Sequence, residues 1–165
     1  CFDISHLSGT IGVGSMVQFR DGTPDKTNYR RFKIKSFEGN DDFRSIAEIV
    51  QRRYSRLSQE GKEFPDLIVI DGGIGQLNAA ANELKKLSLD LPIISLAKQF
   101  EEVYLLDSPD ALRLDRKSDA LKYLQEIRDE AHRFAINYNR LLRSKKLKDE
   151  IQKLNDDKNV RKTAN

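Results

Sequence analysis

The chain has 165 residues, a length that suits one globular domain with a hydrophobic core of its own. Charged residues make up 33% of it and hydrophobic residues 38%, so we expect a folded body with a very polar exterior. The formal net charge of +3 is too small to indicate a polyanionic partner by itself.

The single cysteine, Cys1, excludes an internal disulfide framework and agrees with a reducing cytoplasm. No apolar run is long enough to cross a membrane, and no basic-then-apolar leader opens the chain. The first residue is not methionine and already lies in a strand-like run. We therefore expect a segment of a longer cytoplasmic protein.

The first 35 residues predict three strands, at Cys1–His6, Gly14–Phe19 and Tyr29–Lys35. Asp21–Asp25 supplies turn residues between the second and third strands, so these two are expected to pair as an antiparallel hairpin. Alternation in the first strand places Asp3 on the face opposite Phe2. An acid in a central strand is costly to bury unless it is paired or binds a metal.

A helix is predicted to begin at Asn40–Asp42, because apolar residues recur at three- and four-residue steps from Phe43 to Leu57. Helix capping is enough to explain at least one of Asp41 and Asp42. A polar stretch then leads to the apolar run Leu67–Ile70.

Leu67–Ile70 has no alternation and predicts a strand that is buried on both faces. It ends at Asp71 and a glycine-rich turn, and a helix is expected over Asn78–Leu87. Strand, turn and helix in this order indicate a crossover onto a parallel sheet, where active groups gather at the carboxyl ends of the strands. Simple turn chemistry is the alternative explanation of Asp71.

Pro92–Ala97 predicts a second buried parallel strand, and Val103–Leu106 with Ala111–Leu114 predicts a small hairpin inserted beside the sheet. The longest helix begins at Ser118, and His132 lies at the border of its apolar stripe. The chain is polar and charged beyond Arg143, which fits a frayed helix or a disordered tail. We therefore expect a domain over residues 1–145 and a tail over 146–165.

This order of elements is that of the α/β ribonuclease H-like fold. The expected sheet is mixed and five-stranded, with three antiparallel strands followed by two parallel ones, flanked by helices. In that architecture Asp3 and Asp71 face each other at the centre of the sheet. Two close carboxylates repel each other unless they share a proton or a cation, so a divalent metal is expected, and His132 completes the site if its helix packs over the same strand ends.

Several motifs carry a family resemblance that runs in order from residue 1 to about residue 145. The sequence resembles the carboxy-terminal endonuclease domain family of UvrC, a component of the bacterial UvrABC excinuclease of nucleotide excision repair. The motifs that carry this resemblance are Phe-Asp-Ile-Ser-His at 2–6, Tyr-Arg-Arg-Phe at 29–32, Asp-Asp-Phe at 41–43, Arg-Arg-Tyr at 52–54, the run from Pro65 to Gly73 with Gly-Gln-Leu at 75–77, Leu-Ala-Lys at 96–98, and Ile-Arg-Asp-Glu-Ala-His at 127–132.

The resemblance implies cleavage of damaged double-stranded DNA on the 5′ side of the lesion, with Mg²⁺ or Mn²⁺ as cofactor. By the same resemblance Asp3, Asp71 and His132 form the catalytic and metal-binding triad, and Asp42 is implicated as well. The implied partner is a UvrB–DNA complex, reached through the parent protein in the bacterial cytoplasm. The isolated domain is expected to be a monomer that binds no membrane.

Two departures from the family pattern matter. Ile74 stands where the family usually has lysine, so a phosphate contact from that turn is in doubt. The helix-hairpin-helix pair that normally follows this domain is absent from residues 147–165, and the GIY-YIG nuclease and UvrB-binding segments are also absent.

Basic side chains are expected to make salt-dependent contacts to DNA phosphates without reading bases. The alternative explanation of these basic side chains is that they form a solvated helix face. Two other functions stay open: an inactive ribonuclease H-like module that binds DNA or a partner, and a nucleotide-binding enzyme, although the glycine spacing after Asp71 fits no phosphate-loop fingerprint. The basic residues expected at DNA are Arg30, Arg31, Lys33, Arg52, Arg53, Lys98, Arg140 and Arg143.

Overall fold

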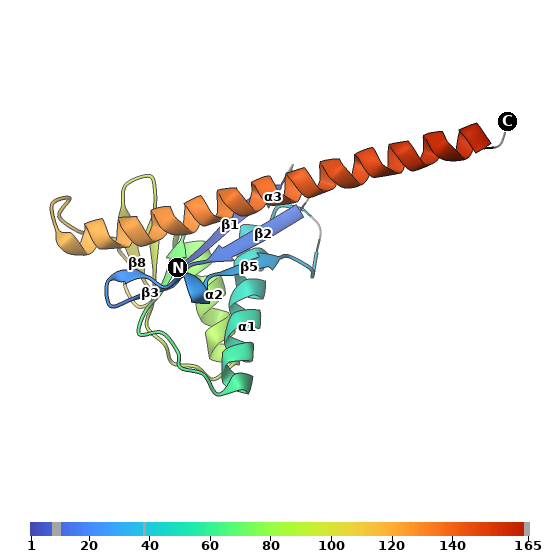
Figure 1. Cartoon of the computed structure of the whole chain (residues 1–165). Coiled ribbons are helices and arrows are strands. Elements are labelled where there is room, and N and C mark those ends of the chain that lie inside the picture. The colour runs from blue at the N-terminus through green and yellow to red at the C-terminus, as the bar shows by residue number, and fades with distance from the viewer. Residues whose placement is uncertain (8–10, 38, 164–165) are drawn as a thin grey trace.

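The computed structural model describes residues 1–7, 11–37 and 39–163, and only the backbone of residues 7, 11 and 156–163. A seven-stranded sheet in the order β5-β2-β1-β6-β7-β8-β9 forms its centre. Helices α1 and α2 pack on one face, and the long helix α3 crosses the other (Figure 1). Among the described helices, none is both long enough and apolar enough to cross a membrane.

The five strands at the heart of the sheet follow the expected ribonuclease H-like order, which confirms the predicted fold class. β1 pairs antiparallel with β2 and parallel with β6; β2 pairs antiparallel with β5, and β6 parallel with β7. The bounds of these strands are β1 Phe2–Leu7, β2 Ile11–Met16, β5 Arg30–Lys33, β6 Ile68–Asp71 and β7 Ile93–Ala97.

The predicted inserted hairpin belongs to the same sheet, so the sheet has seven strands and not five. β8 (Glu102–Leu105) pairs antiparallel with the open edge of β7, and β9 (Leu112–Arg113) pairs with β8. The physical reason is that an unpaired strand edge offers a row of free backbone donors and acceptors, which the hairpin satisfies.

The second predicted strand was placed three residues too late. The turn residues assigned to the hairpin between the second and third strands instead close a smaller hairpin of β3 (Phe19–Arg20) with β4 (Thr23–Pro24). Asp21 and Gly22 both have positive φ, 52° and 79°, which is the backbone that a two-residue hairpin turn requires. A short 3₁₀ turn, η1 at Lys26–Asn28, then leads into β5.

Helix α1 (Asp42–Glu60) begins where the sequence predicts, with the Asp41 carboxylate accepting a hydrogen bond from the backbone N–H of Arg44 at 2.9 Å. Helix α2 (Ile74–Lys86) begins four residues earlier than predicted. The Gln76 side chain accepts from the Gly73 N–H at 3.1 Å, so the helix starts directly after the glycine turn.

Helix α3 runs unbroken from Asp119 to Thr163, so the helical alternative for the polar C-terminal stretch is the one found. Its first half lies across β1 and β2, where the Ser15 hydroxyl donates to the Ala131 carbonyl at 3.0 Å and the Asn139 amide donates to Ser5 at 3.0 Å. Its second half projects beyond the body (Figure 1), and every side chain from Arg143 to Asn155 is exposed. The boundary at residue 145 stays a prediction.

The main hydrophobic core lies between the sheet and the pair α1 and α2. Phe2, Ile70, Ile46, Ile49 and Leu77 are fully or almost fully buried there. Residues that alternate with these on β1 and β2 face α3, where Val17, Ile127 and Ala131 form a smaller cluster. The predicted alternation is therefore confirmed: Phe2 enters the main core, and Asp3 lies beneath α3.

Candidate metal centre

Asp3 is a buried carboxylate in the central strand. β1 has neighbours on both sides, and the Asp3 residue is only 5% exposed. The His132 ring comes down from α3, with Nδ1 at 3.3 Å from Asp3 Oδ2, and about half of the side chain remains open to solvent. The Ser15 bond to the neighbouring Ala131 carbonyl holds this turn of α3 against the sheet.

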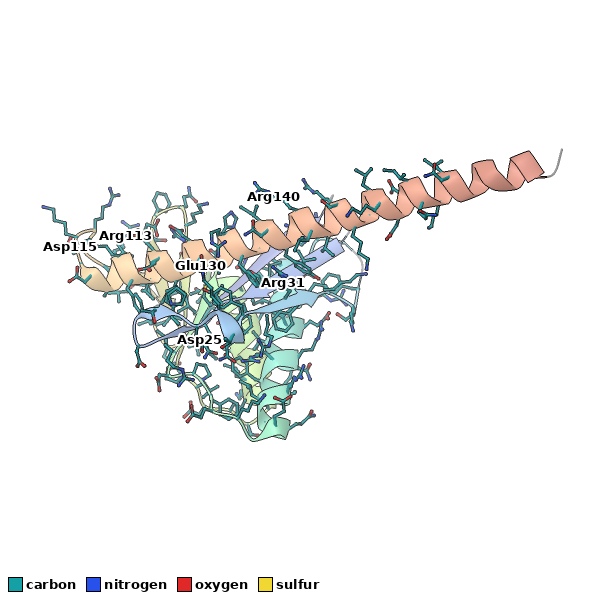
Figure 2. The ribbon with its side chains drawn as sticks, viewed as in Figure 1. Asp25, Arg31, Arg113, Asp115, Glu130 and Arg140 are labelled. Carbon is teal, nitrogen blue, oxygen red and sulfur yellow. The ribbon has the colours of Figure 1, made fainter. Side chains whose placement is uncertain are left out.

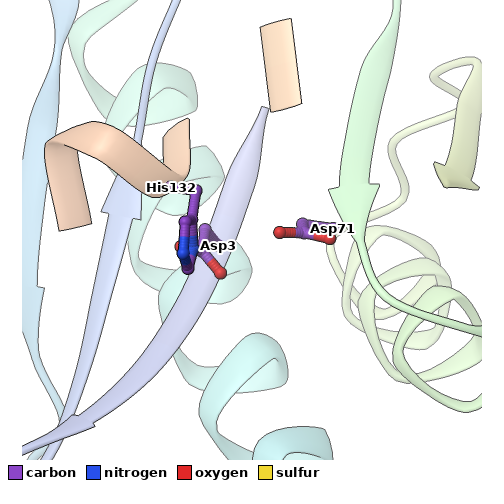
Figure 3. Close-up of side chains that lie close together, drawn as sticks. All are labelled: Asp3, Asp71 and His132. Carbon is purple, nitrogen blue, oxygen red and sulfur yellow. The ribbon is translucent and has the colours of Figure 1, made fainter. Parts of the chain in front are cut away.

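Asp71 is the last residue of β6 and pairs with Leu96 of β7. Figure 3 shows Asp71 at the end of its strand, with its carboxylate directed toward Asp3 and His132. One potential ligand atom from each of the three side chains lies within 4.8 Å of the others. Ligands at about 2.0–2.2 Å from one small divalent ion lie at most about 4.4 Å apart. A small movement of the three side chains toward one another would therefore let all of them contact one ion.

The two acids have raised pKa values, because each carboxylate is poorly solvated. Burial is the largest cause for Asp3 and the Asp71 charge the second, and together they raise the pKa of Asp3 from 3.8 to about 6 against the opposing effect of His132. Burial also raises the pKa of Asp71, while the charges of Arg128, His132 and Lys98 act to lower it. A divalent cation would offset the poor solvation of both carboxylates and the repulsion that Asp71 exerts on Asp3, so the donor set fits a metal.

Asp42 lies near this cluster but is not part of it. Its Oδ1 is 2.5 Å from Nε2 of His6, a residue for which the sequence predicted no role. Its charge makes the smallest of the contributions that raise the pKa of Asp3. Within the described part of the chain, Asp3, Asp71 and His132 form the one cluster of three or more possible metal ligands.

The basic residues expected at DNA fall into different environments. Lys98, Lys33, Arg140 and Arg143 are exposed, and Figure 2 shows Arg140 on the outer side of α3 and Arg31 beneath that helix. The Arg31 guanidinium lies 4.6 Å from the Phe134 ring centre and 5.5 Å from that of Tyr138.

Of the other three basic residues, two are hydrogen-bonded within the protein and one is buried. Arg30 donates to the backbone carbonyls of Thr27 and Tyr29, and Arg52 donates to Glu48 and to the Lys33 carbonyl. Arg53 is 9% exposed and lines a cavity of about 700 Å³ beside Ile68, at the end of β6 remote from Asp71. A phosphate role for all eight residues stays a prediction.

Sequence reasoning gave no role to Arg128, which is buried next to the cluster at 5% exposure. It pairs with Glu101 at 2.6 Å and with Asp129 at 3.0 Å, so it ties α3 to the turn that follows β7. The available signal was its spacing: Arg128 stands four residues before His132, and residues four apart share a helix face.

Comparisons with known proteins show the family to which the chain belongs. The model of the UvrC RNase H endonuclease domain matches residues 1–136. The "UvrABC system protein C" of Methanosarcina mazei is 66% identical over 89% of this chain, that of Methanococcus maripaludis 63% over 89%, and that of Prosthecochloris aestuarii 54% over 88%. The chain spans 28%, 28% and 24% of these relatives. The chain therefore belongs to the family of UvrC RNase H endonuclease domains.

Proposed function

We propose that this chain is a metal-dependent DNA endonuclease that cuts the damaged strand 5′ to a lesion during nucleotide excision repair. The single observation that carries the proposal is the convergence of Asp3, Asp71 and His132 within 4.8 Å. Family membership supports a nuclease of the UvrABC system. The proposed partners are damaged double-stranded DNA and a UvrB–DNA complex engaged through a longer parent protein in the cytoplasm.

Asp3 and Asp71 would hold Mg²⁺ or Mn²⁺, and such an ion lowers the pKa of water and neutralises charge that develops on the phosphate. Asp3 also orients His132, because a carboxylate facing Nδ1 favours the tautomer that carries its proton there. The half-exposed ring is then available at Nε2 as a ligand or as a proton acceptor. Lys98 is exposed, and its positive charge favours the ionised form of Asp71. Its ammonium group is therefore suited to contact a substrate phosphate.

The test combines DNA nicking with thermal unfolding in Mn²⁺ and in EDTA. Mn²⁺ is expected to support nicking by the wild type and to raise its melting temperature, since an ion at about 100 times its dissociation constant stabilises the native state by about 2.7 kcal/mol. Asp71→Asn should lose both effects. The matched control is Asp66→Asn, an exposed acid at the other end of β6, which should keep both.

His132→Ala should abolish nicking and distinguishes the two roles of the ring. Loss of the Mn²⁺-linked stabilisation identifies a ligand, and its retention identifies a proton acceptor. Nicking by Asp71→Asn at the wild-type rate would refute the metal centre and leave an inactive DNA- or partner-binding module as the better explanation.

A further inference from the structure

Arg53 carries a buried positive charge that no acid contacts. The residue is 9% exposed, and within the described part of the chain no hydrogen bond or ion pair holds its guanidinium. Arg56, on the same helix, is exposed and pairs with Glu60 at 2.7 Å. Burial lowers the pKa of Arg53, and the charge of Arg30 acts in the same direction. A buried cation without a partner is unfavourable, so an anion from outside the described residues would stabilise it.

The Arg53 side chain lines a cavity that is large enough for such an anion. The cavity has a volume of about 700 Å³, and sites for small ligands have about 300–1,000 Å³. Arg20 also lines the cavity, but it is exposed and lies 3.9 Å from Glu63. Arg53 is therefore the buried cation of this cavity. Three exposed acids line it as well, namely Asp21, Glu63 and Asp66.

The charges around the cavity favour a carboxylate over a phosphate. The planar guanidinium of arginine matches either group, because two parallel N–H donors can meet two oxygens. One carboxylate balances the single charge of Arg53. A doubly charged phosphate would leave a net negative charge near the three exposed acids, which would repel it.

The first residue of β1's extension shows where a carboxylate can enter. Cys1 lines the same cavity, and its backbone nitrogen donates to the Val17 carbonyl at 2.9 Å while the Val17 N–H donates to the Cys1 carbonyl at 3.0 Å. These bonds continue the pairing of β1 with β2. Cys1 packs beneath α3, whereas Phe2 enters the core beside α1. Because side chains alternate along a strand, a residue that continued β1 before Cys1 would point toward α1, the helix that carries Arg53.

We propose that Arg53 binds a carboxylate that enters this cavity beside Cys1. The carboxylate can come from a side chain that precedes Cys1 in a longer parent protein or from a free organic acid, and the alternation of β1 favours the first source. The site lies at the opposite end of β6 from Asp71, and it does not rest on the proposed nuclease function. It assigns Arg53 to a carboxylate instead of a DNA phosphate.

The first experiment supplies the carboxylate as part of the chain. Thermal unfolding in EDTA compares the chain extended by Gly-Ser-Glu before Cys1 with the chain extended by Gly-Ser-Gln. The glutamate form is expected to melt about 4 °C or more above the glutamine form, because it adds a hydrogen bond between two charged groups. Arg53→Met should abolish the difference. Arg56→Met is the matched control and should keep it, since that exposed arginine is paired with Glu60.

The second experiment supplies the carboxylate free in solution. Butyrate should raise the melting temperature of the unextended wild type more than butyramide does at equal ionic strength, and Arg53→Met should remove that effect. A response to the extension alone identifies a side chain of the parent protein, and a response to butyrate alone identifies a free acid. The proposal is overturned if neither carboxylate acts, if Arg53→Met responds as fully as wild type, or if inorganic phosphate acts through Arg53 more strongly than butyrate.

Discussion

Replacing Asp3 with asparagine is expected to stabilise the metal-free protein at neutral pH. The folded state raises the pKa of Asp3 from 3.8 to about 6, so the folded protein holds this proton more tightly than the unfolded chain does. Each pH unit in this interval corresponds to about 1.4 kcal/mol. The wild type therefore loses about 3 kcal/mol of stability as the pH rises from 3.8 to 6, and it recovers that stability on acidification.

Asparagine has nearly the same shape and carries no charge, so Asp3→Asn should avoid most of that loss. Urea unfolding in EDTA, followed by circular dichroism, should show the variant up to about 3 kcal/mol more stable than wild type at about pH 8. The advantage should shrink toward zero near about pH 4, where Asp3 is largely protonated in the folded wild type. Carboxylates that do not interact with Asp3 titrate alike in both proteins and cancel in the difference, whereas the titration of Asp71 is linked to that of Asp3 and contributes to it. A variant that is less stable at the higher pH, or a difference that does not vary with pH, would refute the electrostatic explanation.

Three further outcomes are expected. Asp41→Ala should lower the free energy of unfolding by about 1 kcal/mol in urea titrations, because it removes the N-cap of α1; no change would show that solvent replaces this cap. Binding of the chain to DNA, followed by fluorescence anisotropy, should weaken linearly in log–log form as salt increases, and a flat dependence would exclude phosphate contacts as its main source. Truncation after Lys146 should change the unfolding midpoint very little, because the side chains from Arg143 to Asn155 are exposed; a large loss of stability would mean that the projecting helix supports the body.

The sequence was sufficient for the elements that bury apolar residues with a clear period. The first strand, α1 and the buried strand before Asp71 were placed within a few residues, and the fold class followed from their order. The three side chains Asp3, Asp71 and His132 do lie together, although their chemical roles stay predictions.

The remaining features depend on contacts that no local pattern contains. β8 and β9 join the sheet because the edge of β7 is free, and their own residues fit an isolated hairpin equally well. β2 ends at Met16, and Asp21 and Gly22 form the tight turn of the separate hairpin of β3 and β4. The role of Arg128 depends on Glu101, which is 27 residues away along the chain.

Helix α3 combines two regions with very different opening rates. Around His132, bonds from Ser15 and Asn139 join the helix to the sheet, so its backbone amides should exchange with solvent only when the domain unfolds. From Arg143 to Asn155 every side chain is exposed, and exposed helical turns open and close within about a microsecond. One continuous helix therefore carries a slow, rigid half that fixes the His132 ring and a fast half from which hydrogen exchange should begin.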